Sequence, residues 1–255
     1  MSDFVQSLER GLAVIRAFDA DHPEMTLSDV AKVTGLTRAA ARRFLHTLVE
    51  LGYMRTDGKL FALRPKVLDL GYSYLSSLGL PDVAQPHLEK LATEVHESCS
   101  VSVLDGTDIV YVARVPTKRI MKVMIETGTR FPAHATSMGR TILAAQDPAW
   151  LDSFLATTTL TPLTSRTITD ATELRAELTR VSTQGWCVVD EELENGLRSV
   201  AAPIRNQGKV VAAVNISTHV SRPVDSVHTD LLPPLLATAE AISADLTASG
   251  GTLGR

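Results

Sequence analysis

The chain has 255 residues and a formal net charge of −4 at pH 7, and 44% of its residues are hydrophobic. This length suits about two domains, each with its own core. Residues 1–80 carry 10 Lys and Arg against 9 Asp and Glu, whereas the remainder carries 15 against 20. This balance excludes a generally basic protein that wraps nucleic acid, so any contact with nucleic acid is expected to be local and amino-terminal.

The two cysteines, Cys99 and Cys187, are too few for a disulfide framework or a four-cysteine metal site. No apolar run is long enough to cross a bilayer, and no signal-peptide pattern stands at the amino terminus. We therefore expect a cytoplasmic protein without membrane contact, metal or cofactor.

The first predicted helix starts near Val5. Its apolar residues recur at three- and four-residue spacing, which places them on one helical face. We expect this face to complete the core of a small amino-terminal domain. The residues expected in that core are Leu8, Leu12, Ile15 and Phe18.

Residues 26–51 predict two helices joined by a tight turn. Thr26 and Asp29 have the spacing of a helix start, in which the hydroxyl accepts an unpaired backbone N–H and the acid faces the positive helix end. Gly35 can adopt the left-handed conformation that a side chain would penalise. Thr37 is expected to cap the second helix, and the whole order of signals predicts a helix-turn-helix.

The second of these helices has an apolar face at positions 41, 44, 45 and 48, and its basic residues lie elsewhere. Arginines of this kind often only solvate a surface helix. Here the caps, the turn glycine and the apolar face occur together at the offsets of a DNA-binding helix pair, so we favour DNA recognition. Residues 53–63 then predict two short strands around Asp57-Gly58, a dipeptide that suits the positive-φ positions of a two-residue turn, and the hairpin makes a winged motif.

On a winged helix-turn-helix, the second helix enters the major groove and the wing lies beside phosphates or the minor groove. Guanidinium can bridge guanine O6 and N7, so Arg38 and Arg42 are the candidates for base contacts, and Arg43 and Lys59 are expected to bind phosphate. The predicted DNA-binding residues are Thr26, Ser28, Thr37, Arg38, Ala39, Arg42, Arg43, His46, Arg55 and Lys59.

Residues 65–80 predict a linker helix with a wide apolar surface, ended by Gly79 and Pro81. This surface either packs on the protein's own domains or pairs with its twin in a homodimer. We favour the homodimer, because helix-turn-helix proteins commonly bind two-fold half-sites. The predicted domains are residues 1–64, a winged helix-turn-helix, residues 65–80, the linker, and residues 81–250, an effector domain.

Helix and strand patterns mix from residue 81 onward, which predicts an α+β second domain. A polar loop is expected at 157–169 and a frayed tail at 249–255, and Pro233-Pro234 should kink or restart the last helix. Helices are predicted at 83–97, 137–145, 148–155, 171–184 and 224–247. Strands are predicted at 100–104, 109–113, 119–125, 187–190, 199–204 and 210–217.

The acidic segment 190–194 resembles a paired-carboxylate or metal site, but carboxylates bunched in a loop usually form a solvated turn. No catalytic motif accompanies them, and the histidines lack ligand spacing, so we expect no enzyme and no catalytic residue. The alternative function is a thiol-based redox-responsive DNA-binding regulator that uses Cys99 or Cys187. Both cysteines flank or enter predicted strands, where buried inert thiols are commoner.

The chain resembles the IclR family of bacterial transcriptional regulators over nearly its whole length. Its amino-acid sequence is most similar to the branch that controls β-ketoadipate-pathway genes, of the PcaR, PcaU and PobR type. The segments that carry the resemblance are FVQSLERGLAVIRAF at 4–18, the helix-turn-helix block with its hairpin, FPAHATSMGRTILAA at 131–145, GWCVVDEELENGLRSVAAPI at 185–204 and VVAAVNIS at 210–217.

The resemblance implies a winged helix-turn-helix domain joined by a helix to a GAF-like α/β effector-binding domain, acting as a dimer or a dimer of dimers on a palindromic operator. The implied ligand is a small organic acid, either an aromatic acid or a ring-cleavage metabolite, that controls catabolic genes. The positions that match the family's pocket are Ser137, Met138, Val189, Asp190, Ser199, Asn215 and Ser217. Several relatives have cysteine at the position of Ser199, an acid at Val189 and serine at Asn215, so the identity of the effector does not transfer.

The chemistry of the residues independently points to the same segment. The N–H groups of Ser137, Met138 and Gly139 open a predicted helix and could receive a carboxylate, although Ser137 could equally be its cap. His134 has the same ambiguity. A second carboxylate could be neutralised by one of five basic residues, although we expect most of them to be solvated at the surface, and we single out Arg130. The five are Arg114, Arg119, Lys122, Arg130 and Arg198.

Overall fold

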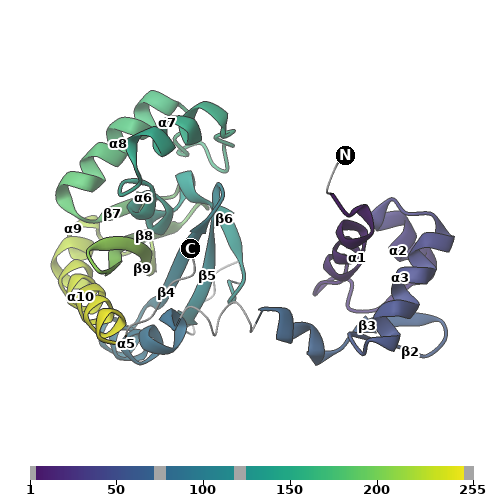
Figure 1. Cartoon of the computed structure of the whole chain (residues 1–255). Coiled ribbons are helices and arrows are strands. Elements are labelled where there is room, and N and C mark those ends of the chain that lie inside the picture. Colours follow the sequence, from purple (N-terminus) through teal and green to yellow (C-terminus); the bar gives the residue numbers. More distant parts are fainter. Residues whose placement is uncertain (1–3, 72–78, 118–124, 250–255) are drawn as a thin grey trace. The chain divides into compact units, whose positions relative to one another are not determined.

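The computed structural model describes residues 4–71, 79–117 and 125–249. The chain divides into two compact units, Met1–Ser76 and Ser77–Arg255, and each has its own hydrophobic core (Figure 1). No helix in the described ranges is both long and apolar enough to cross a membrane.

The amino-terminal unit is a helix-turn-helix with a small antiparallel sheet of order β1-β3-β2. Its elements are α1 (Gln6–Arg16), β1 (Met25–Thr26), α2 (Leu27–Thr34), α3 (Arg38–Glu50), β2 (Met54–Thr56) and β3 (Leu60–Leu63). Thr26 and Asp29 form a reciprocal capping box at the start of α2. Gly35 ends α2 with a φ of 67°, and the Thr37 hydroxyl accepts the N–H of Ala40 at 3.2 Å. The predicted caps and turn are confirmed.

The core of this unit differs from the sequence prediction along α1. Val14 and Phe18 are buried and Ile15 is half-buried, whereas Leu8 and Leu12 are 63% and 48% exposed. The assignment of Leu8 and Leu12 to the core was wrong. Two adjacent apolar stripes run along α1, and spacing within a helix cannot decide which stripe faces α2 and α3.

The predicted hairpin forms from β2 and β3, but its turn differs in detail. Thr56 pairs with Phe61, and the Asp57 carboxylate accepts the N–H groups of Lys59 and Leu60 at 2.8 and 2.7 Å. Gly58 has a φ of 97°, and Asp57 does not have a positive φ. Asp57 therefore closes the turn through its side chain instead of occupying a positive-φ position.

The described residues cover only the two ends of the predicted linker helix. Residues 65–67 form a 3-10 turn and residues 68–71 are helical, whereas 72–78 lie outside the described residues. Gly79 has a φ of 59°, and α5 (Leu80–Val95) begins directly after it. Pro81 thus lies in the first turn of α5, where its missing N–H leaves no hydrogen bond unmade, instead of ending the preceding helix.

The framework of the carboxy-terminal unit is an antiparallel sheet of order β6-β5-β4-β9-β8-β7. Its strands are β4 (Ser98–Asp105), β5 (Asp108–Val115), β6 (Arg130–Pro132), β7 (Cys187–Asp190), β8 (Leu197–Asn206) and β9 (Lys209–His219). The sequence did not predict β6. Of the strand predicted over 119–125, only Ile125 is described, and it lies outside any strand.

Helices cover both faces of this sheet (Figure 1). The remaining elements are a 3-10 turn at Ala133–Ala135, α6 (Ser137–Leu143), α7 (Pro148–Thr157), α8 (Ala171–Gln184), α9 (Val224–Ser226), a π-helical turn at Val227–Leu231, and α10 (Leu232–Ala248). One face packs against α5 and α10, and the other against α6, which in turn contacts α8. Every residue of α6 is buried. The last helix is interrupted as predicted, with Pro233-Pro234 in the first turn of α10.

Candidate DNA-binding surface and effector cavity

One face of α3 presents a set of exposed side chains to solvent. The opposite face buries Ala41, Leu45 and Leu48 in the core. None of the α3 arginines pairs with a carboxylate within the described ranges, so these cations are available to a polyanion. The His46 ring packs edge-on against Phe61 of β3 and thereby ties the helix to the wing. The predicted DNA-binding residues on this exposed face are Arg38, Ala39, Arg42, Arg43 and His46.

The other predicted DNA-binding residues lie at helix starts and on the wing. Thr26 is committed to the capping box of α2, and Ser28 is exposed. The Thr37 hydroxyl oxygen accepts the N–H of Ala40, and its own O–H remains free to donate. Lys59 is exposed in the hairpin turn, and Arg55 pairs with Glu24 at 2.8 Å. Because both partners of this pair are solvent-exposed, it contributes at most about 1 kcal/mol, and Arg55 can exchange Glu24 for a phosphate.

The carboxy-terminal unit contains a cavity between its sheet and the start of α6. About 10 Å³ of it is free for the centre of a water molecule, which is room for about one water. The predicted effector residues in its wall are Ser137, Met138, Val189, Ser199, Asn215 and Ser217.

Two buried polar atoms in this wall have no hydrogen-bond partner among the described residues. They are Ser137 Oγ and Asn215 Oδ1, on side chains that are 1% and 2% exposed. The other end of the Asn215 amide donates to Ser217 Oγ at 3.0 Å. An unpartnered buried polar group costs about 1–3 kcal/mol, so a ligand that supplies the missing bonds recovers that free energy.

Other predicted effector residues do not line the cavity. Arg130 is exposed and pairs with Asp105 at 2.6 Å and with Asp108 at 3.3 Å. Asp190 pairs with Arg198 at 2.9 Å. Arg130 and Asp190 therefore have their ion-pair partners outside the cavity wall.

His134 is buried outside the cavity wall, and its Nε2 lies 3.2 Å from the Thr161 carbonyl oxygen. Burial lowers its pKa below the ordinary value, so the neutral ring is favoured. His134 therefore holds the loop around Thr161 in place.

The start of α6 also differs from the prediction. Thr136 caps the helix by accepting the N–H of Gly139 at 3.1 Å, so that N–H is not available to a carboxylate. A Cβ atom on Gly139 would collide with the backbone of Ala133, which makes this glycine a packing requirement. Ser137 is the first helical residue and not the cap, and its hydroxyl faces the cavity.

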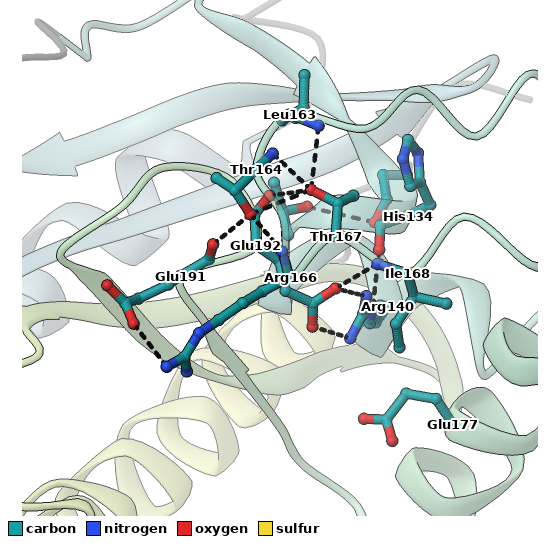
Figure 2. Close-up of polar contacts among 12 residues, drawn as sticks. His134, Arg140, Leu163, Thr164, Arg166, Thr167, Ile168, Glu177, Glu191 and Glu192 are labelled. Atoms are coloured by element: carbon teal, nitrogen blue, oxygen red, sulfur yellow. Dashed lines mark hydrogen bonds and ion pairs between the residues drawn. The ribbon is translucent and has the colours of Figure 1, made fainter.

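A buried ion pair anchors the helix that forms this wall. Arg140 on α6 is 1% exposed, and its Nη1 and Nη2 bind the Glu192 carboxylate at 2.7 and 2.5 Å. Arg140 Nε donates to the His134 carbonyl at 2.7 Å, and the Ile168 N–H donates to Glu192 at 2.9 Å (Figure 2). The pair therefore joins α6 to two loops, 158–170 and 191–196.

Further contacts hold these two loops together (Figure 2). Thr167 donates to the Glu192 carbonyl at 2.7 Å, and Thr164 donates to the Glu191 carbonyl at 2.6 Å. Arg166 pairs with the Glu191 carboxylate at 3.2 Å. The acidic segment thus has structural partners, and no group of three potential ligands in the described ranges is placed to hold a metal ion.

Several residues of the wall were not predicted from sequence. Leu193 is the one apolar residue inside the acidic run 190–194, and that contrast was an available signal for an inward-facing side chain. Tyr111 gave no such signal, because its direction depends on an irregularity in β5. The unpredicted residues in the wall are Tyr111, Ile125, Thr136, Leu193 and Leu197.

The two cysteines are buried thiols on strands. Both are 0% exposed, and burial raises the pKa of each to about 12. A raised thiol pKa lowers the fraction of reactive thiolate at neutral pH. The structure therefore disfavours the redox alternative.

Comparisons with known proteins cover both units. A family model described as "IclR helix-turn-helix domain" matches residues 7–58, and one described as "Bacterial transcriptional regulator IclR C-terminal" matches residues 72–244. The Pca regulon regulatory protein of Pseudomonas putida is 48% identical over 238 residues, which cover 92% of this chain and 82% of that protein.

Two solved structures share the fold over almost the whole chain. A transcriptional regulator from Rhodococcus sp. RHA1 is 59% identical with a TM-score of 0.88, covering 96% of this chain and 100% of that one. An IclR homolog from Microbacterium hydrocarbonoxydans, complexed with 4-hydroxybenzoate, is 26% identical with a TM-score of 0.85, covering 95% and 99%.

Replacing Glu192 with glutamine should destabilise the carboxy-terminal unit by about 3–5 kcal/mol, because Arg140 would remain buried without its counter-charge. Trp150 and Trp186 are the only tryptophans and both lie in this unit, so their fluorescence during urea unfolding isolates its transition. The matched control is Asp152→Asn, which breaks an exposed pair with Arg175 and should cost less than about 1 kcal/mol. Equal effects of the two substitutions would contradict an anchoring role for Glu192.

Proposed function

Because the chain belongs to the IclR family of bacterial transcriptional regulators, we propose that α3 binds an operator in double-stranded DNA and that a small organic acid in the cavity changes this binding. The proposed effector is an aromatic acid or a ring-cleavage metabolite, and the proposed targets are catabolic genes. The observation that carries the proposal is a pair of buried polar atoms in the cavity wall, Ser137 Oγ and Asn215 Oδ1, which have no hydrogen-bond partner among the described residues.

Similar proteins support this class of effector. The Pseudomonas putida relative is named for the Pca regulon, and the Microbacterium structure holds 4-hydroxybenzoate. The relatives named for their activity are transcriptional regulators, in keeping with a binding cavity rather than a catalytic centre.

The arrangement of α3 supports direct contact with base edges. Arg38 and Arg42 are one helical turn apart on its exposed face, where bidentate contacts to guanine are possible. Arg43 on α3 and Lys59 on the wing are assigned to phosphate contacts. Arg55 also lies on the wing. Binding of this kind should weaken as the salt concentration rises.

The small free volume of the cavity supports coupling between ligand and conformation. Space for about one water cannot hold an aromatic acid, so binding must move parts of the wall. A ligand shifts a conformational equilibrium by as much as its affinities for the two states differ. The proposed shift changes the spacing of paired recognition helices on a palindromic operator.

The exposed stripe of α1 supports a homodimer. Val5, Leu8 and Leu12 are each about half exposed or more, although they are large and apolar. Leu68 and Leu70, at the described start of the linker, are also exposed. Exposed apolar surface of this kind is typical of protein interfaces. We propose a homodimer through these surfaces, with a dimer of dimers as its larger form.

Arg42→Ala should weaken operator binding by about 1–3 kcal/mol and relax the preference at one base pair, because one bidentate base contact is lost. Fluorescence anisotropy on a set of duplexes selected from random sequence measures both effects. Arg16→Ala removes an exposed arginine from α1 and is the charge-matched control. A uniform loss on all duplexes would reassign Arg42 to phosphate contact.

Ser137→Ala should stabilise the unliganded protein by up to about 1–3 kcal/mol, since it removes an unpartnered buried hydroxyl, but should weaken effector binding by about 0.5–1.5 kcal/mol. The measurement is the thermal shift caused by protocatechuate, 4-hydroxybenzoate, β-ketoadipate and short keto acids. Thr141→Val removes a neighbouring hydroxyl that bonds the Ser137 carbonyl, and it should leave the ligand response intact. No response of the unaltered protein to any of these acids would reject the proposed effector class.

Leu8→Glu with Leu12→Glu should raise the dimer dissociation constant at least tenfold, because both charges would enter the apolar interface. Sedimentation equilibrium of the full chain measures this constant. Leu51→Glu adds a charge at another exposed leucine of the same unit and is the control. An unchanged constant in the double variant would remove α1 from the interface.

A further inference from the structure

Arg114 lies on the same face of the sheet as the cavity wall. In the strand register, Arg114 lies opposite Ser100 on β4, and Ser100 lies opposite Asn215 on β9. The three side chains therefore share one face of the sheet. Asn215 faces the cavity. Arg114 is therefore two strands from Asn215, about 10 Å at the backbone, and its Nη1 donates to Ser100 Oγ on the intervening strand at 3.0 Å.

A β-bulge determines this direction of the Arg114 side chain. Val101 pairs with Ala113, but Ser102 pairs with Tyr111, which leaves Val112 as an extra residue in β5. In a regular strand, residues three apart point to opposite faces. The extra residue brings Tyr111 and Arg114 to the same face, and Tyr111 lines the cavity.

The guanidinium of Arg114 has no counter-charge within the described ranges. Its Nε is buried and makes no hydrogen bond, so Ser100 satisfies only one end of the group. Burial lowers the pKa of Arg114, and no carboxylate of the described residues pairs with it to oppose that effect. The arginines of this unit that do pair with carboxylates are Arg130, Arg140, Arg166, Arg175, Arg180, Arg198 and Arg222.

The strand face between Arg114 and the cavity is polar although it is buried. Ser100 and Ser102 are 0% exposed, and Ser102 bonds the Met138 sulfur. A core that only had to pack would carry apolar side chains here. The polar face formed by Ser100 and Ser102 thus extends from the cavity wall to Arg114, whose Nη1 donates to Ser100 Oγ.

We propose that Arg114 binds the carboxylate of the effector through its Nε–Nη2 edge, and that Ser137 and Asn215 bind a hydroxyl at the opposite end of the ligand. Two parallel N–H···O bonds from one guanidinium edge match the geometry of a carboxylate. This inference rests on the effector binding proposed above and names its chemical class: a small acid with a hydroxyl group remote from its carboxylate.

The test uses the full chain with two probe pairs, each an acid and its neutral amide. The pairs are 4-hydroxybenzoate with 4-hydroxybenzamide, and 3,4-dihydroxybenzoate with 3,4-dihydroxybenzamide. Isothermal titration should find Arg114→Gln at least tenfold weaker for the acid and within twofold of the unaltered protein for the amide. Arg205→Gln is the control, since Arg205 is an exposed arginine of this unit that pairs with no carboxylate in the described ranges, and it should change neither affinity.

Arg114→Lys gives a second measurement that keeps the positive charge. It should retain a preference for the acid over the amide but bind the acid less tightly, because lysine lacks the bidentate edge. Tryptophan fluorescence checks that each variant is folded. Equal losses for acid and amide, or no loss for the acid in Arg114→Gln, would overturn the assignment while leaving the cavity as the effector site. Failure of the unaltered protein to bind either acid would overturn the assignment of Arg114 and the hydroxy-acid class, whereas the proposed function falls only if the thermal-shift series above also gives no response.

Discussion

The buried ion pair between Arg140 and Glu192 determines how the effector half of the molecule is built. Removing two charges from water costs several kcal/mol per ion, and their attraction offsets this only when every remaining donor and acceptor is also satisfied. The His134 carbonyl accepts the Nε–H of Arg140 and the Ile168 N–H donates to Glu192, so each charged side chain has a hydrogen bond beyond the ion pair itself. The pair therefore specifies the positions of α6 and of both loops, and with them the positions of Ser137 and Leu193 in the cavity wall.

The cavity has the opposite property, because its polar groups are incompletely satisfied. Each guanidinium nitrogen of Arg140 makes a hydrogen bond, whereas Ser137 Oγ, Asn215 Oδ1 and Arg114 Nε have no partner among the described residues. A protein that buries such groups loses stability in its closed form and gains it when a ligand with matching polar groups enters. The ordered surroundings of Arg140 and the unmet bonding capacity around Asn215 are the two properties on which the proposed effector response rests.

Sequence analysis predicted the features of the amino-terminal unit that depend on neighbouring residues. The capping box of Thr26 and Asp29 and the left-handed Gly35 involve atoms no more than a few residues apart, so their geometry follows from the local sequence. The burial of α1 was predicted wrongly, because Leu8 and Leu12 lie on a stripe that is as apolar as the one through Val14 and Phe18. Only the packing of α1 on α2 and α3 distinguishes the two stripes.

In the carboxy-terminal unit, the sequence by itself determined the helix and strand periods, the family, and most of the residues that line the cavity. It did not determine which arginine stands beside them: Arg130, the candidate from sequence, is paired with Asp105 at the surface, and Arg114 lies on the cavity face. The tertiary structure decided this through the bulge at Val112 and the register of β5 against β4. Register and bulges depend on contacts between strands that are distant in sequence, and a shift of one residue turns every following side chain to the other face.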